Sequence, residues 1–286
     1  MPDPIQHWPK RLWLVRHGQS QGNVARDGAE EAGLSVIDLD LRDVDVPLSE
    51  LGHSQAEATG RWFAALPDNE RPEVLLSSPY IRARQTAEAI CAAGGLAGGA
   101  RPTVLDERLR EREFGIFDGL TGRGIREQFP REAAHRKKMG KFYHRPPGGE
   151  SWADVILRLR SALNTINLQY ADQRVLIVCH QVVVFCMRYI LEELTEEKIM
   201  EIDRQAEILN CGIAAYDFQP TAPSLCVPTL ALWNLGAPLE AEGTPTTAGR
   251  DLMTGSRCHQ RRHPGPDPGS ASPLRTKKAD PGSGPG

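Results

Sequence analysis

The stretch Leu12-Trp13-Leu14-Val15-Arg16-His17-Gly18-Gln19-Ser20 organises the rest of the chain. Its short apolar run is typical of a buried strand, and the glycine behind the two polar residues indicates a turn. In open α/β sheets, ligands bind beyond the carboxyl ends of the strands, where this turn would lie. There Arg16 can grip phosphate oxygens in bidentate fashion, His17 can attack phosphorus, and Gly18 lets the backbone approach a ligand closely.

Composition and charge narrow the class of protein. The 286 residues are enough for one large α/β domain or two small ones, and a net charge of -3 does not favour a nucleic-acid partner. No apolar run approaches the roughly 18 residues that span a bilayer, and residues 1–7 lack the pattern of a signal peptide. The six cysteines show no Cys-x-x-Cys and no zinc-finger spacing. We therefore expect a cytoplasmic protein with reduced thiols, without a disulfide or a structural metal.

Apolar periodicity predicts strands and helices in alternation. The expected strands are 12–15, 74–78, 103–105, 174–179, 212–218 and 229–234. The expected helices are 55–66, 80–90, 123–129, 132–142, 152–170 and 182–194. Residues 21–46 are polar and are expected to form a long functional loop with at most one short helix. From residue 237 the composition shifts to Pro, Gly, Ser and Thr, which predicts a disordered tail.

A second histidine repeats the layout of the first. His180 ends the buried strand 174–179 and is followed by Gln181. If the two strands are parallel neighbours, their ends bring the imidazoles of His17 and His180 together. Taken without other motifs, a lone core histidine is the competing interpretation.

Four segments, in order, resemble the motifs of the histidine phosphatase superfamily, which includes the cofactor-dependent phosphoglycerate mutases. The segments are 14–20, 77–86, 109–121 and 175–181. The resemblance implies a three-layer α/β sandwich with a mixed, mostly parallel central sheet. We expect this domain over residues 9–236, between an N-terminal extension of residues 1–8 and the tail of residues 237–286.

The resemblance also implies roles for the matched residues. His17 is the expected nucleophile, and Arg16 and Arg82 are the expected ligands of the phosphoryl group. His180 stands at the last catalytic motif, and Asn23 stands where the family pattern places a further phosphate ligand. The two guanidinium groups would lower the pKa of His17, because a proton there would put like charges together.

The proton donor is expected in segment 109–121. The motif matches Glu111, with Glu113 as its rival and Asp118 as the outsider. Attack by His17 would give a phosphohistidine, and the acid would protonate the leaving oxygen. The incoming phosphate dianion would raise the pKa of Glu111, and the carboxylate would activate water in the second half-reaction.

Segments 175–181 and 142–151 resemble the fructose-2,6-bisphosphatase branch in particular. In that branch a basic segment before the Pro-Gly-Glu-Ser turn holds the sugar phosphate. Lys137, Lys141 and Arg145 are therefore expected to bind substrate.

Gly18 and Gln181 are expected to bind substrate as well, although most of the superfamily has glycine where Gln181 stands. Phe185 occupies a position where the branch has arginine, and no Gly-x-x-x-x-Gly-Lys-Ser/Thr loop is present. A strict fructose-2,6-bisphosphatase assignment and a kinase half are therefore not expected.

These observations predict a metal-independent hydrolase of phosphomonoesters, acting on a small phosphorylated metabolite such as a sugar phosphate or bisphosphate. No cofactor, nucleic-acid partner or membrane partner is expected, and a homodimer is left open. The alternatives are a phosphotransferase of the phosphoglycerate mutase type and a non-catalytic module that binds a phosphorylated ligand.

Overall fold

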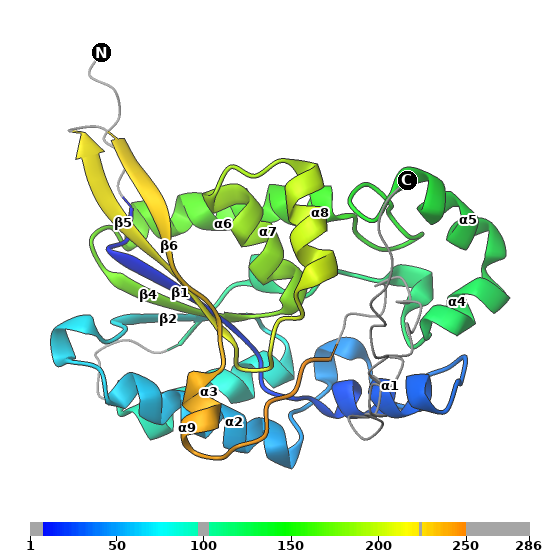
Figure 1. Ribbon diagram of the computed structural model, residues 1–286, viewed down its shortest axis with the longest axis horizontal. Helices are drawn as coiled ribbons and strands as arrows, with labels where there is room; N and C mark the ends of the chain where they lie inside the picture. Colours follow the sequence, from blue (N-terminus) through cyan, green and yellow to red (C-terminus); the bar gives the residue numbers. More distant parts are fainter. Residues whose placement is uncertain (1–7, 97–102, 223–224, 250–286) are drawn as a thin grey trace, which may run out of the picture. The chain divides into compact units, whose positions relative to one another are not determined.

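A mixed sheet forms the centre of the protein (Figure 1). The computed structural model describes residues 8–96, 103–222 and 225–249, and over these the sheet has six strands in the order β3-β2-β4-β1-β5-β6. The strands are β1 (Arg11–Arg16), β2 (Val74–Ser77), β3 (Val104–Leu105), β4 (Arg174–Cys179), β5 (Ile213–Ala222) and β6 (Leu225–Leu235). The first four run parallel, whereas β5 is antiparallel to β1 and β6 to β5. The expected mixed, mostly parallel sheet is confirmed.

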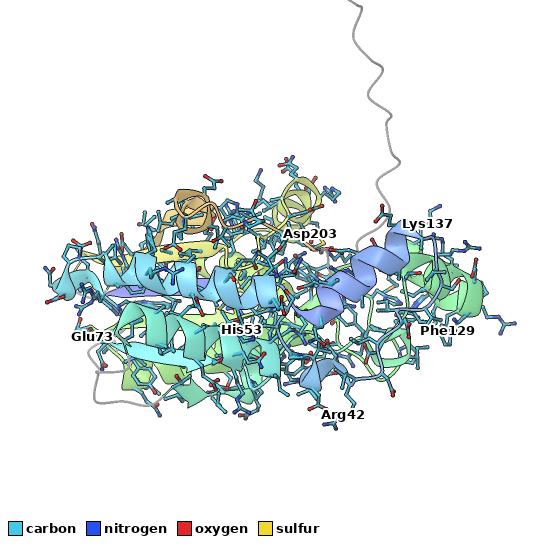
Figure 2. All side chains as sticks on the ribbon, turned by 90° about the horizontal axis from the view of Figure 1, so that it is seen from below. Arg42, His53, Glu73, Phe129, Lys137 and Asp203 are labelled. Atoms are coloured by element: carbon cyan, nitrogen blue, oxygen red, sulfur yellow. The ribbon has the colours of Figure 1, made fainter. Side chains whose placement is uncertain are left out.

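Helices cover both faces of the sheet and extend beyond the ends of its strands. They are α1 (Gln21–Glu31), α2 (Glu50–Ala64), α3 (Ile81–Gly94), α4 (Gly122–Gln128), α5 (Pro130–Met139), α6 (Trp152–Gln169), α7 (Gln181–Leu191), α8 (Glu196–Gln205) and α9 (Ala237–Ala241). In Figure 1, α6, α7 and α8 lie over one face, α2, α3 and α9 over the other, and α1, α4 and α5 to one side. Figure 2 places Phe129 and Lys137 at the opposite end of the molecule from Glu73. None of the described helices is long and apolar enough to cross a bilayer.

The central strand β1 is buried on both faces. Leu12 and Leu14 belong to the apolar cluster under α6 and α7, and Trp13 and Val15 to the cluster under α2 and α3. All four side chains are inaccessible to solvent. Because successive residues of a strand face opposite sides, a strand covered on both sides is apolar throughout. This explains why its sequence shows no alternation.

The expected long loop after β1 contains the eleven-residue helix α1. The helix begins with a capping box in which Ser20 Oγ accepts from the Asn23 amide and Asn23 Oδ1 accepts from the Ser20 amide. These bonds satisfy two backbone donors at the helix start. The capping pair therefore ties the site segment to the first turn of α1.

Residues 237–249 depart from the expected disordered tail. They form α9 and the segment that follows it, and Leu239 of α9 is fully buried in a cluster with Ala56, Ala58 and Cys211. Residues 250–286 lie outside the described part of the chain, as do residues 1–7 of the expected N-terminal extension. The last residue of that extension, Trp8, stacks on Phe218 with ring centroids 4.9 Å apart, so it packs with the domain.

Candidate active site

The pairing of β1 with β4 brings two histidines together. Arg16 is the register partner of Cys179 in this parallel pair, and His17 and His180 follow directly. Their ring centroids lie 5.1 Å apart, and the residues are 3% and 0% exposed. The two imidazoles therefore share one desolvated environment at the carboxyl ends of neighbouring strands.

The ring of His17 is held in one tautomer. Its Nδ1 lies 2.7 Å from the carbonyl oxygen of Gly18, which can only accept a hydrogen bond. Nδ1 therefore carries the proton, and Nε2 keeps its lone pair. Burial lowers the pKa of His17 well below its ordinary value, and the charges of Arg82 and Arg16 lower it further. The imidazole is thus neutral, with Nε2 available as a nucleophile.

His180 is oriented by Ser78. Its Nε2 lies 2.8 Å from Ser78 Oγ, whereas Nδ1 has no hydrogen-bond partner among the described residues. Nδ1 lies 4.0 Å from Oε2 of Glu111. Burial lowers the pKa of His180 well below its ordinary value, and Arg82 and His17 add to the effect. This ring is therefore a neutral neighbour of the nucleophile.

Carbonyl oxygens and one carboxylate fix the two arginines. Arg16 donates Nη1 to the carbonyl of Ile208 at 2.5 Å and Nη2 to that of Gly249 at 2.8 Å. Arg82 pairs with the carboxylate of Asp43 at 3.0 Å, and its guanidinium lies over the ring of Tyr80 at 4.9 Å. Both cations are therefore held in place before any ligand arrives.

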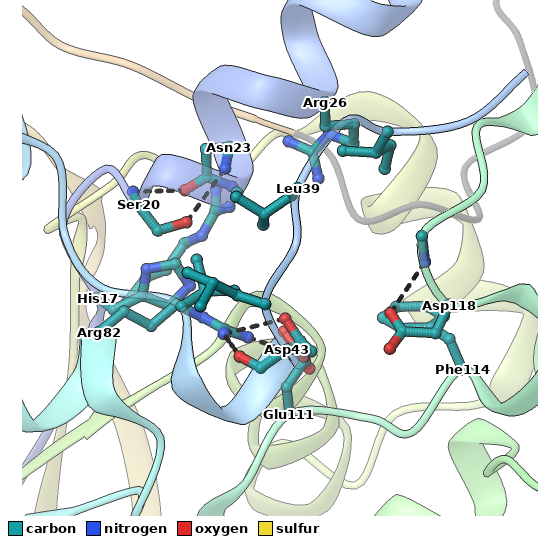
Figure 3. Close-up of a pocket in the computed structure, with 16 residues that line it drawn as sticks. His17, Ser20, Asn23, Arg26, Leu39, Asp43, Arg82, Glu111, Phe114 and Asp118 are labelled. Carbon is teal, nitrogen blue, oxygen red and sulfur yellow. Dashed lines mark hydrogen bonds and ion pairs between the residues drawn. The ribbon is translucent and has the colours of Figure 1, made fainter. Parts of the chain in front are cut away.

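Arg16, His17 and Arg82 line a cavity of about 190 Å³, whereas His180 lies behind His17 and is not among the lining residues (Figure 3). Figure 3 shows His17 and Arg82 on one side of it and Asp118 on the other, with Glu111 between them. Leu39, Leu41 and Phe114 contribute apolar surface. The cavity combines a cationic wall, an apolar part and carboxylates, which suits a small anionic ester with an organic group.

The structure separates the three candidates for the acid. Glu111 lines the cavity, is 3% exposed and accepts the backbone N–H of Arg112 at 2.8 Å. Glu113 is not among the residues that line it, and it accepts from the hydroxyl of Tyr80 at 3.0 Å. Asp118 does line it, and burial, followed by the charge of Asp43, raises its pKa. Glu111 and Asp118 therefore have access to a ligand, and Glu111 is the one near the histidines.

The basic residues expected to bind substrate do not line the cavity. Lys141 donates to both carboxylate oxygens of Asp203, at 2.7 and 2.8 Å. Arg145 pairs with Asp154 at the start of α6, and Lys137 is exposed on α5. Two of the three side chains thus have structural partners distant from the cavity.

Gly18 and Gln181, which were also expected to bind substrate, do not line the cavity either. A Cβ at Gly18 would lie 2.4 Å from the carbonyl oxygen of Gly52, and the Gly18 amide donates to Thr86 Oγ1 at 3.0 Å. Because glycine has no side chain, the first turn of α2 can pack directly against the backbone at Gly18. Gln181 is buried at the start of α7, and neither residue is among those that line the cavity.

Asn23 and Arg26 line the cavity from α1, one turn apart. The sequence indicated only Asn23. Arg26 is 6% exposed, and its Nε has no hydrogen-bond partner among the described residues. Arg26 could have been predicted from its spacing, because it follows Asn23 by three residues and residues i and i+3 of a helix share a face.

The segment of residues 244–249, here called the C-terminal strap, supports His17 and Asn23 through Asn210. Asn210 is fully buried and donates Nδ2 to the carbonyl of His17 at 3.1 Å and to Asn23 Oδ1 at 3.3 Å. Its Oδ1 accepts from the hydroxyl of Thr247 at 2.9 Å. The same strap supplies the Gly249 carbonyl that holds Arg16. No local sequence pattern indicates these long-range bonds.

The fold and the cavity define an α/β protein with a cationic cavity at the carboxyl ends of its parallel strands. A family comparison matches residues 12–227 to the histidine phosphatase superfamily (branch 1), which is most of the described chain. The protein belongs to this superfamily. The family expected from the four motifs is therefore confirmed.

Two curated relatives carry different names. A 6-phosphofructo-2-kinase/fructose-2,6-bisphosphatase of Caenorhabditis elegans is 31% identical over 184 residues, which are 63% of this chain and 33% of that protein. A probable phosphoglycerate mutase of Yersinia pestis is 30% identical over 211 residues, 73% of this chain and 85% of that protein. The chain thus spans about a third of the bifunctional relatives that it matches.

Solved structures agree with this assignment. A mycobacterial glucosyl-3-phosphoglycerate phosphatase in complex with VO3 superposes with a TM-score of 0.60 at 25% identity, over 79% of this chain and 99% of that one. An alpha-ribazole phosphatase from Shigella flexneri has a TM-score of 0.60 at 22% identity, over 79% and 96% of the two chains, and shows the fold alone. The expected α/β fold class is confirmed, and these structural neighbours are phosphatases.

The neutral, buried histidines predict a pH-dependent stability. Unfolded histidines have a pKa of about 6.5, whereas His17 and His180 stay neutral in the fold well below that pH. The unfolded state therefore binds more protons as pH falls below about 7, and the free energy of unfolding decreases by up to about 1.4 kcal/mol per pH unit for each histidine. Urea unfolding between about pH 8 and pH 5 measures this slope. His180→Gln should reduce it, and an unchanged slope would contradict the neutral state of that ring.

The strap predicts a coupling between Thr247 and the nucleophile. Thr247→Val removes the hydroxyl that donates to Asn210 at nearly constant shape and leaves a buried acceptor without its partner, which should cost about 1–3 kcal/mol. Loosening Asn210 should also lower kcat, because Asn210 holds the carbonyl of His17. Thr246→Val, at an exposed position of the same strap, is the control. Equal unfolding energies and rates in the two variants would show that the strap does not support the site.

Proposed function

We propose that the protein hydrolyses phosphomonoesters of small metabolites through a phosphohistidine on His17, without a metal ion. One observation carries the proposal. The Nδ1 of His17 is bonded to the Gly18 carbonyl, so its Nε2 has a free lone pair at the cationic wall of the cavity. A neutral imidazole beside two guanidinium groups suits attack on a phosphoryl group.

The first half-reaction uses the cavity as it stands. The phosphoryl oxygens bind to the guanidinium groups of Arg16 and Arg82. Because Arg82 pairs with Asp43 in the structure, the phosphoryl group competes with this carboxylate for Arg82. Phosphoryl transfer depends mainly on positioning and on stabilising charge at the equatorial oxygens, which guanidinium groups supply. A bond forms between Nε2 of His17 and phosphorus while the ester P–O bond breaks. The leaving oxygen takes its proton from Glu111.

The second half-reaction reverses these roles. Glu111, now ionised, takes a proton from a water molecule while the oxygen of that water attacks phosphorus. The P–N bond breaks, inorganic phosphate leaves, and His17 returns to its neutral form. His180, fixed by Ser78, stays beside the reacting group and gives it a polar, preorganised neighbour.

The cavity and the relatives support a small substrate. A volume of about 190 Å³ leaves room for a phosphoryl group and a small organic group rather than a macromolecule. Arg26 of α1 adds a third cation to the lining of the cavity, beside Arg16 and Arg82. This additional positive charge favours a second anionic group on the substrate. The names of the relatives refer to a fructose bisphosphate, a phosphoglycerate and a glucosyl phosphoglycerate, each a small phosphorylated metabolite.

A phosphotransferase of the mutase type is the second candidate, favoured by the relative named as a probable phosphoglycerate mutase. It would need the product to stay bound and to be phosphorylated again, and no feature of the cavity requires this. A binding module without catalysis is disfavoured, since the nucleophile, both arginines, the second histidine and an acid are all present.

Phosphate release by the full chain, with a chelator present, tests the proposal. The panel holds p-nitrophenyl phosphate, 3-phosphoglycerate, 2,3-bisphosphoglycerate, fructose 2,6-bisphosphate and glucosyl-3-phosphoglycerate. His17→Ala should lose on the order of 10³-fold or more in kcat, and rapid acid quench should no longer trap an acid-labile phosphoprotein. Turnover that survives His17→Ala, or that requires a metal, would refute the mechanism. Conversion of 3-phosphoglycerate to its isomer, primed by the bisphosphate, would identify a mutase.

The identity of the acid has its own test. Glu111→Gln should lower kcat by about 10²–10⁴-fold for alkyl phosphates, and far less for p-nitrophenyl phosphate, whose leaving group needs no proton. Asp118→Asn is the matched control, because it changes the other cavity carboxylate in the same way. If the dependence on the leaving group follows Asp118 instead, then Glu111 is not the acid.

A further inference from the structure

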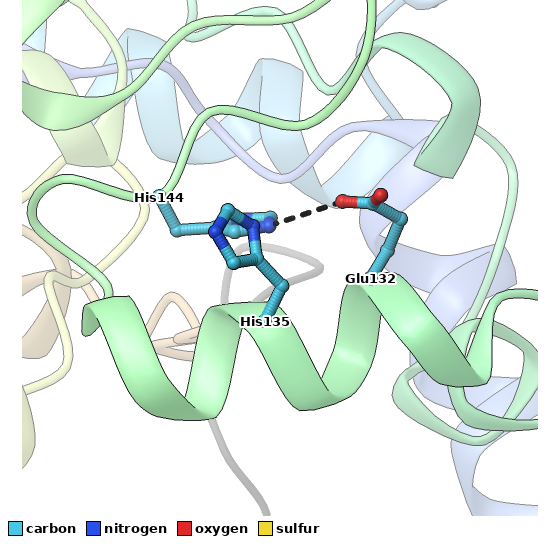
Figure 4. A group of neighbouring side chains, drawn as sticks. All are labelled: Glu132, His135 and His144. Carbon is cyan, nitrogen blue, oxygen red and sulfur yellow. Dashed lines mark ion pairs between the residues drawn. The ribbon is translucent and has the colours of Figure 1, made fainter.

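Three side chains with metal-binding atoms meet outside the catalytic cavity (Figure 4). Glu132 and His135 lie on α5, three residues apart and so on one face of the helix, and His144 comes from the segment that follows α5. One ligand atom of each lies within 4.8 Å of the others. None of the three is among the residues that line the catalytic cavity.

His144 gives an independent indication of a ligand. It is 1% exposed, and neither of its ring nitrogens has a hydrogen-bond partner among the described residues. A buried polar group without a partner is costly and rare in folded proteins. Its Nε2 faces the carboxylate of Glu132 at 3.6 Å, beyond hydrogen-bond distance. A cation between the two groups would satisfy both.

We propose that Glu132, His135 and His144 form a zinc site. Two imidazole nitrogens and one carboxylate oxygen are a donor set that zinc favours, with water as the fourth ligand. Tetrahedral zinc with bonds of about 2.0–2.1 Å needs donors roughly 3.3 Å apart. The ligand atoms lie within 4.8 Å of one another, so the less buried Glu132 and His135 would move toward the buried ring of His144 to reach this spacing.

The ring of His144 is held as an anchored ligand. It stacks on Phe117 with centroids 6.1 Å apart and an interplanar angle of 13°. His135 meets it edge-on, with centroids 5.7 Å apart. The buried member of the site is therefore the rigid one, and the exposed member is free to complete the coordination.

The donor set restricts which metal can bind. Imidazole nitrogens suit zinc, whereas magnesium prefers carboxylate, carbonyl and water oxygens. Two imidazoles beside one carboxylate therefore select zinc over magnesium.

Zinc at this position would clamp α5 to the segment that leads into α6. The carbonyl of His144 accepts from Arg112 Nη2 at 3.4 Å, and Arg112 Nε donates to the carbonyl of Glu150 at 2.6 Å. Arg112 directly follows Glu111. The site therefore stabilises the wall of the cavity that carries the acid, and it takes no part in the reaction itself.

Zinc binding to the metal-free full chain tests the site. Calorimetry with Zn²⁺ alone should give one ion per chain, and Co²⁺ should give the visible absorption of a four-coordinate ion. His135→Ala and Glu132→Gln, both outside the core, should each weaken binding at least tenfold. Zn²⁺ should raise the Tm of the parent chain and not that of His135→Ala, because a ligand stabilises only the state that binds it. Mg²⁺ should not bind.

Two controls exclude other histidines. His53→Ala changes an exposed histidine on α2, which Figure 2 places away from Phe129 and Lys137. His17→Ala removes the catalytic ring. Both should keep full zinc affinity. Loss of zinc in His17→Ala with retention in His135→Ala would assign the ion to the catalytic pair and overturn the proposal, as would the absence of any bound ion.

Discussion

The parallel pairing of β1 with β4 is the constraint on which the site depends. It sets Arg16 opposite Cys179, so the residues that follow, His17 and His180, leave the sheet side by side. A slip of one residue would turn every side chain of β1 to the other face and exchange the two apolar clusters that cover it. Because both faces are packed with large side chains, the register is strongly specified. The apolar core thus fixes the geometry of the polar site.

Burial determines the chemistry of the paired histidines. Desolvation and nearby cations keep both rings neutral, which preserves the lone pair of His17 but places two guanidinium groups in a poorly hydrated region. The carbonyl oxygens of Ile208 and Gly249 accept from Arg16, and the carboxylate of Asp43 pairs with Arg82. These contacts hold both cations at the cavity wall, where their positive charge favours an anionic ligand.

The sequence was sufficient for the parts of the fold and site that local patterns encode. The apolar run of 174–179 predicted β4 with its observed bounds, and short motifs identified His17, Arg82 and Glu111 as cavity residues. Lys141 shows the limit of such patterns. Its place in a basic segment that resembles the fructose-2,6-bisphosphatase branch suggested a substrate contact, and the structure pairs it with Asp203, 62 residues further along the chain. The sequence shows that a cationic side chain is present, but it does not show which distant carboxylate pairs with it in the fold.

The C-terminal strap was missed for a related reason. Composition predicted disorder from residue 237, since this part has too few apolar residues to bury. Its attachment depends instead on backbone and hydroxyl groups: Gly249 accepts from Arg16, Thr247 donates to Asn210, and Gln55 donates to Pro245. Such bonds use atoms that every residue, or any threonine, can provide, so composition does not reveal them.

These bonds also place part of the catalytic support beyond the family core. The family match ends at residue 227, whereas Thr247 and Gly249 follow it and contact Asn210 and Arg16. Arg16 and His17 thus belong to the part of the chain that matches the family, and two of the groups that hold them belong to a segment outside it. Changes in that segment can alter how rigidly these two side chains are held without replacing either of them. In this protein, the precision of the cavity therefore depends partly on a segment that the family motifs do not include.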